Sequence, residues 1–110
     1  MVEINWEDVI GRMLQAAANS LKGDWPRVRS VMERDLRDIA DDAKDIERDY
    51  AAGKLDEQTA KRYRQIVNNK AKTLEALIRG MVKLSAERAV NSALTVLRAT
   101  VNTLVGWAVL

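Results

Sequence analysis

Hydrophobic residues recur every three or four positions along most of the chain, which is the spacing of a helix that buries one face. Asn5 stands where an N-cap residue is expected and Gly23 where a terminating glycine is expected. Between them the apolar positions are Val9, Ile10, Met13, Leu14, Ala17 and Leu21. The pattern predicts a first helix over residues 6–22.

Two longer segments, residues 25–52 and 56–84, repeat this spacing and are separated by Gly53 and Asp56. The glycine is suited to ending one helix and the aspartate to capping the next, and Asp24 is in the same position before residue 25. The apolar seam of the first segment includes Leu36, Ile39 and Ile46, and that of the second runs through Tyr63, Val67, Lys70, Leu74, Leu77, Met81 and Leu84. We therefore expect an antiparallel helical hairpin that buries Leu36, Ile39, Ile46, Leu74 and Leu77.

The charges of the two hairpin arms are complementary. Residues 24–50 carry nine acidic and six basic residues, a net charge of −3, whereas residues 54–88 carry four acidic and nine basic residues, a net charge of +5. A reversal at Gly53 would bring Asp45 near Lys61 and Asp42 near Arg64. Exposed ion pairs add only about 0.2–1 kcal/mol each, but they favour one register over others.

The last segment, residues 85–110, is strongly apolar, and Ser85 can cap it as a fourth helix, although a helix continuous with the preceding one is the alternative. Small residues at 85, 89 and 93 permit close packing against a matching strip at 16, 17 and 20. Arg98 would cost about 2.5–3.5 kcal/mol at the centre of a bilayer, which disfavours a transmembrane helix. A narrow polar stripe otherwise interrupts the apolar surface at Arg88, Asn91, Thr95, Arg98 and Asn102.

Covering so apolar a helix demands more partner surface than the other segments offer, so we expect self-association through the C-terminal helix. Its predicted contact residues are Val101, Leu104, Val105, Trp107 and Leu110. In a ring of such helices the polar stripe would face a wet lumen. The predicted fold class is all-α, a helical hairpin extended to a three- or four-helix bundle within one domain of residues 1–110, and oligomeric.

The composition removes several kinds of chemistry. The chain has no Cys and no His among its 110 residues, so disulfides, thiol nucleophiles and the usual zinc or haem ligands are excluded. No cofactor motif is present either. The start, MVEINWEDVI, is acidic where a secretion signal is basic, which predicts no signal peptide and a place in the cytoplasm or in an assembled particle.

Two charged motifs have a functional and a structural interpretation. Asp41, Asp42 and Asp45 spell DDxxD, which in isoprenoid diphosphate synthases binds magnesium-diphosphate; without a second acidic motif we expect only a solvated stripe and no metal. The basic run at residues 61–64 could contact phosphates, but the neighbouring acidic arm neutralises it, so a nucleic-acid partner is disfavoured.

These observations favour a non-enzymatic structural, assembly or interaction protein, and a phage or other mobile-element origin would suit such a small helical protein. One alternative is a membrane-active or pore-forming protein that uses its C-terminal helix. A second is a helical module that binds nucleic acid or another protein.

Overall fold

The computed structural model describes residues 3–83 and 85–110, which form four α-helices and one short 3₁₀-helix. Their bounds are α1 Trp6–Leu21, η1 Lys22–Asp24, α2 Trp25–Ala51, α3 Glu57–Arg79 and α4 Ala86–Val105. The predicted all-helical fold is confirmed, and the described residues contain no strand. α3 ends at Arg79, before the predicted end at residue 84, which itself lies outside the described residues.

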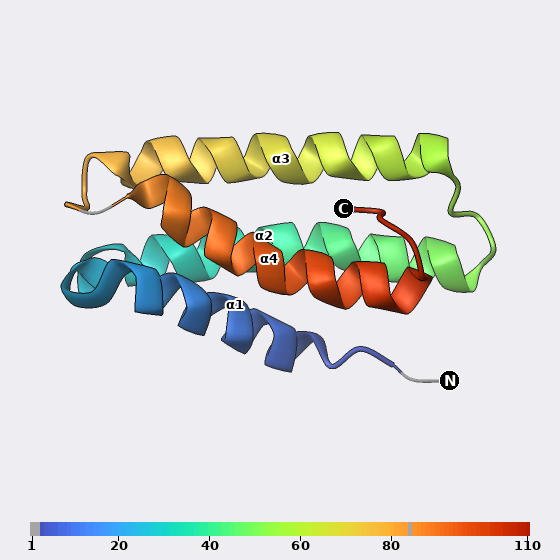
Figure 1. Cartoon of the computed structure of the whole chain (residues 1–110), viewed down its shortest axis with the longest axis horizontal. Helices are drawn as coiled ribbons and strands as arrows, with labels where there is room; N and C mark the ends of the chain where they lie inside the picture. The colour runs from blue at the N-terminus through green and yellow to red at the C-terminus, as the bar shows by residue number, and fades with distance from the viewer. Residues whose placement is uncertain (1–2, 84) are drawn as a thin grey trace.

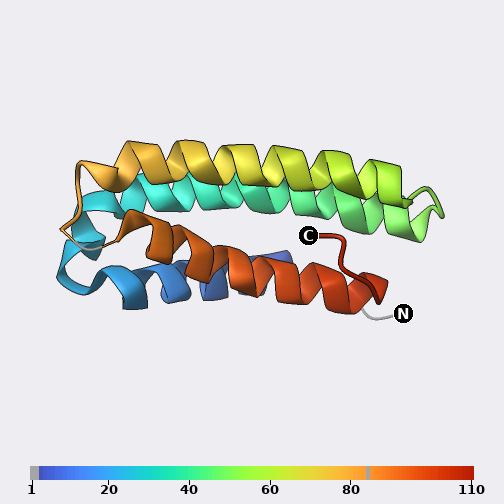
Figure 2. The same cartoon turned by 45° about the horizontal axis from the view of Figure 1, so that its top comes forward.

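The four helices form two antiparallel pairs. α2 and α3 run alongside each other and are joined by the turn that contains Gly53, while α1 and α4 form the second pair. Figure 2 shows the α1–α4 pair packed against the α2–α3 pair, so that the apolar stripes of all four helices meet in one core. The bundle measures 43 × 25 × 19 Å.

Three helices begin at the expected caps. In each case a short polar side chain accepts a hydrogen bond from a backbone N–H of the first turn, which has no partner within the helix. The caps are Asn5, Asp56 and Ser85, which bind the N–H groups of Asp8, Thr59 and Arg88 at 3.1, 2.8 and 3.1 Å.

The junction between α1 and α2 differs from the prediction. The residue with the positive φ expected of Gly23 is Lys22, at φ +51°. Asp24 makes no capping bond, because its carboxylate accepts a hydrogen bond of 2.8 Å from the backbone N–H of Lys83. This buried aspartate therefore ties the α1–α2 turn to the segment before α4.

The register of α2 against α3 also differs from the expected one. Lys70 Nζ lies 2.7 Å from a carboxylate oxygen of Asp42 and 3.0 Å from one of Asp38. Asp42 was expected near Arg64, and Asp45 near Lys61. Arg64 instead pairs with Glu57 of its own helix, and Asp45 pairs with Arg48 of α2. One reason is the position of the turn. It occupies residues 52–56, so its centre is Lys54 and not Gly53, and α3 is shifted along α2 relative to the expected register.

Of the five residues expected in the hairpin core, four are buried and one is not. Leu36, Ile39, Ile46 and Leu74 are at most 1% exposed, whereas Leu77 is 47% exposed. The buried line of α3 continues from Leu74 to Ile78, one helical turn of four residues, which leaves Leu77 on the outer flank.

Small residues of α1 and α4 are buried between the helices, although Ser85 of the expected strip is exposed and caps α4. Ala17, Ala89 and Ala93 are fully buried, and the hydroxyl oxygens of Ser20 and Ser92 lie 3.1 Å apart. The expectation that a single chain cannot cover its C-terminal helix is wrong, because the other three helices bury eight residues of α4. A turn separates α3 from α4, so the two do not form one continuous helix.

Candidate functional site

The C-terminal helix ends five residues before the end of the chain, not at residue 110 as predicted. Gly106 adopts φ +89°, a left-handed conformation that glycine enters without strain, and its N–H donates a 2.8 Å hydrogen bond to the carbonyl of Asn102. The chain then reverses and runs back beside α4 (Figure 1). A glycine so near the end of an apolar run is the sequence signal that could have predicted this stop.

The reversed segment is held by side chains on two sides. Asn102 Oδ1 accepts hydrogen bonds of 2.9 Å from the backbone N–H groups of both Val109 and Leu110. Arg64 Nη1 donates to the carbonyls of Ala108 and Val109 at 3.2 and 3.1 Å. These hydrogen bonds fix residues 108–110, and the Val109 side chain is completely buried.

The predicted polar stripe of α4 does not act as one surface. Asn102 binds the reversed segment, and Arg98 Nη2 reaches Asn68 Oδ1 of α3 at 3.3 Å. Arg88, Asn91 and Thr95 are exposed and border a shallow polar depression near the start of α4. Two residues of the stripe therefore make contacts within the chain, and the other three face solvent.

The five residues predicted for self-association also separate into two groups. Val101 and Val105 are buried in the chain's own core, at 1% and 8% exposure. Leu104 and Leu110 are half-buried, and Trp107 is 38% exposed. Only these last three reach the surface, at the end of the bundle where α4 terminates.

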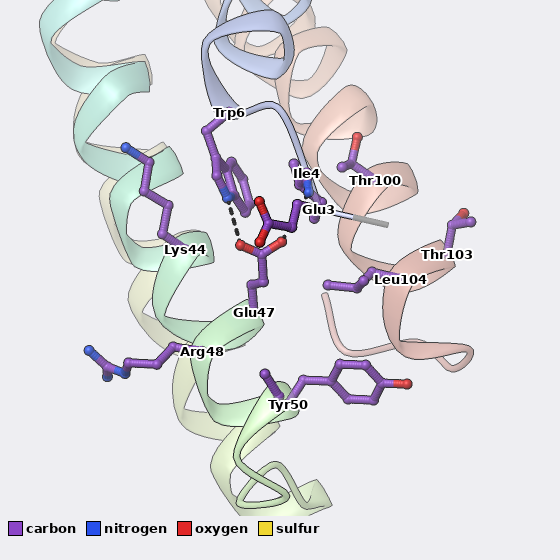
Figure 3. Close-up of a pocket in the computed structure, with 11 residues that line it drawn as sticks. Glu3, Ile4, Trp6, Lys44, Glu47, Arg48, Tyr50, Thr100, Thr103 and Leu104 are labelled. Carbon is purple, nitrogen blue, oxygen red and sulfur yellow. Dashed lines mark hydrogen bonds between the residues drawn. The ribbon is translucent and has the colours of Figure 1, made fainter. Parts of the chain in front are cut away.

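At this end the bundle has a groove of about 970 Å³. It opens where the short N-terminal segment and α1 leave the last turns of α2 and α4 uncovered (Figure 3). Its walls are lined by Glu3, Ile4, Trp6, Lys44, Glu47, Arg48, Tyr50, Ala51, Thr100, Thr103 and Leu104. Tyr50 is 43% exposed, so this part of the groove is apolar and accessible to solvent.

Glu47 joins the N-terminal segment to α2 in this groove. One carboxylate oxygen accepts a 3.1 Å hydrogen bond from Trp6 Nε1, and the other accepts a 3.3 Å hydrogen bond from the backbone N–H of Ile4 (Figure 3). The basic residues Lys44 and Arg48 point away from Glu47 in the same view. The sequence does not predict this contact, because nothing in the local pattern connects residues 41 positions apart.

Lys44 and Arg48 are already paired along α2. Lys44 Nζ lies 3.1 Å from Asp41, and Arg48 lies 3.2 Å from Asp45 and 3.7 Å from Asp49. Two of the three DDxxD carboxylates are thus engaged on their own helix, and Asp42 binds Lys70 of α3. Throughout residues 3–83 and 85–110, no group of three or more acidic side chains is placed to hold a metal ion.

Tyr63 and Lys70 of α3 have shifted pKa values. Burial, together with a 2.6 Å hydrogen bond to Asp49, raises the pKa of the Tyr63 hydroxyl to about 12. The hydrogen bond to Asp42 is the main cause that raises the pKa of the Lys70 ammonium above its usual value, with a further contribution from Asp38. Both groups hold α2 to α3, so we assign them a structural part.

Comparisons with known protein families, with curated proteins and with solved structures find no match to this chain. No helix in the described part of the chain is long and apolar enough to cross a membrane.

Proposed function

We propose that this chain is a non-enzymatic helical assembly or interaction protein that self-associates through the end of the bundle where α4 terminates. The observation that carries the proposal is Trp107, a large aromatic side chain left 38% exposed on a backbone that hydrogen bonds hold in place. Tryptophan is among the residues that contribute most to protein interfaces.

The surroundings of Trp107 support this assignment. Leu104 and Leu110 are half-buried on either side of it in sequence, and the exposed Tyr50 lines the adjoining groove. When a contact residue is already fixed before binding, less conformational entropy is lost on association. Hydrogen bonds on both sides of the indole provide such pre-organisation.

The proposed association surface contains fewer residues than the one expected from the sequence. Val101 and Val105 serve the core of the single chain, so the association surface consists of Leu104, Trp107 and Leu110 with their neighbours in the groove. The α4 helices of two copies therefore meet at their ends, and not along their full length.

Sedimentation equilibrium of the intact chain, from about 10 µM to 1 mM, tests the proposal. We expect the average mass to rise above that of the 12.4 kDa chain as concentration increases. A monomer over the whole range would contradict self-association. Flotation of that monomer with lipid vesicles would instead support attachment to membranes through the same apolar end.

A further inference from the structure

We propose that two copies form a twofold dimer in which Trp107 of each copy inserts into the groove of the other, between the N-terminal segment, α2 and α4. This inference rests on the proposed self-association and adds its geometry, its stoichiometry and the residues that receive the indole. A twofold contact uses the same surface of both copies, so the projecting group and its receptor must lie on one surface. Trp107 follows Thr103 and Leu104 of the groove by only a few residues, so the indole and the proposed receptor lie at the same end of the bundle.

Trp107 differs from the other two tryptophans. Trp6 and Trp25 are half-buried against the core, and the indole N–H of Trp6 is bonded to Glu47. Trp107 is the exposed one, although its backbone carbonyl accepts a 2.9 Å hydrogen bond from Val109 and the chain beyond it is fixed. Because the backbone is held and 38% of Trp107 remains exposed, the segment presents a positioned aromatic group to a partner.

The groove suits an indole. Ile4, Tyr50 and Leu104 supply apolar contact, and the volume of about 970 Å³ leaves room for a side chain of this size. The groove already contains one such contact, in which the indole N–H of Trp6 donates a hydrogen bond to the carboxylate of Glu47. Glu3 lies on the same wall and offers an acceptor for the N–H of a second indole (Figure 3).

Charged side chains of both signs surround the groove. Glu3 stands on the N-terminal wall, and Lys44 and Arg48 border the groove on α2. Lys44 and Arg48 are already paired with Asp41, Asp45 and Asp49, so a contact between two copies would rest on apolar packing and not on ion pairs between them. This pattern favours a second copy of the chain over a strongly charged partner.

The available area limits the strength of the dimer. The two shorter dimensions of the bundle, 25 and 19 Å, give an end face of about 500 Å² per copy, below the ~800 Å² of a standard stable interface. The reciprocal insertion of the indoles adds the groove walls to this area, so we expect a weak dimer that forms at about 10 µM to 1 mM.

A filtered nuclear Overhauser experiment tests the geometry directly. In an equal mixture of isotope-labelled and unlabelled wild-type chains near 1 mM, the Trp107 ring protons of one copy should show contacts with the Ile4 and Leu104 methyl groups of the other. A concentration-dependent dimer without these contacts would overturn the inference and leave self-association standing, whereas a monomer at 1 mM would overturn both.

Two substitutions provide an independent measurement. Trp107→Ala should weaken dimerisation in sedimentation at least about 30-fold, the loss expected for a central interface tryptophan. Thr103→Arg, at an exposed position in the groove wall, should block the groove while leaving Trp107 in place, and should weaken dimerisation similarly. The matched control is Leu77→Ala, which removes an exposed apolar side chain from α3 and should change the affinity by less than about twofold. Equal effects of Trp107→Ala and Leu77→Ala would show that the dimer does not use this groove.

Discussion

The side-chain oxygen of Asn102 accepts a 2.9 Å hydrogen bond from the backbone N–H of Val109, seven residues further along the chain. Through this bond a residue in the last turn of α4 holds the reversed segment that follows the helix. The Val109 side chain is fully buried as a result, and Trp107 lies within the closed turn. The order of residues 108–110 therefore depends on the Asn102 amide and the Arg64 guanidinium as well as on apolar packing.

Replacing Asn102 by Ala should release the C-terminal segment. The N–H groups of Val109 and Leu110 lose their shared acceptor, which should lower the free energy of unfolding by about 1–3 kcal/mol. Hydrogen exchange at these two amides should accelerate well before global unfolding. Asn102→Asp keeps an acceptor oxygen and should retain most of the protection.

The control for this change is Asn91→Ala, at an exposed position of the same helix, which should alter stability by less than about 0.5 kcal/mol. Unchanged exchange at Val109 and Leu110 in the Asn102→Ala protein would mean that apolar packing and the remaining hydrogen bonds, including those from Arg64, hold the segment without Asn102.

Leu74 and Leu77 provide a comparison between a core and a surface leucine on one helix. Leu74→Ala should lower the free energy of unfolding by about 2–5 kcal/mol, because Leu74 is fully buried and its removal leaves a cavity. Leu77→Ala should cost less than about 0.5 kcal/mol, since 47% of that side chain is already exposed. Chemical denaturation of both variants measures the difference, and similar losses would place Leu77 in the core after all.

The sequence predicted the positions of the helices well because local chemistry determines them. The caps at Asn5, Asp56 and Ser85 and the apolar spacing that follows them are readable within a few residues. The positive φ of Gly53 likewise agrees with a turn between two helices.

Contacts between distant residues could not be predicted in the same way. The bond between Asp24 and Lys83, and that between Trp6 and Glu47, depend on how the helices slide and tilt against each other. Leu77 illustrates this difficulty. It stands three residues after Leu74 and is exposed, whereas Ile78, four residues after Leu74, is buried. The groove likewise arises from the different lengths of α1 and α2, and no short motif encodes it.

Asp41, Asp42 and Asp45 should bind no magnesium with micromolar affinity. Asp42 is engaged by Lys70, and the other two carboxylates pair with basic residues of α2, so they do not converge on one point. Calorimetric titration of wild type and of the variant with Asn at all three positions should give the same weak, non-saturating signal with magnesium. A stoichiometric site that disappears in the triple variant would restore the magnesium-diphosphate interpretation of DDxxD.

Tyr63 should make the stability of the bundle sensitive to alkaline pH. Burial and the hydrogen bond to Asp49 raise the pKa of Tyr63 in the folded chain to about 12, from about 10 in the unfolded chain. Its contribution is therefore complete below pH 10 and is lost as the pH rises from 10 to 12. At neutral pH, Tyr63→Phe should lower the free energy of unfolding by about 0.5–1.5 kcal/mol, the usual value of one hydrogen bond.

The difference in stability between wild type and Tyr63→Phe, measured by denaturation at several pH values, should then shrink between pH 10 and pH 12. The Lys70 ammonium, whose pKa is raised above its usual value, is present in both proteins, so its effect cancels in the difference. Tyr50→Phe changes an exposed ring and serves as the control for the removal of a tyrosine hydroxyl. If the difference instead stayed constant up to pH 12, the Tyr63 hydroxyl would not be coupled to folding, and the contact with Asp49 would contribute nothing to holding α3 against α2.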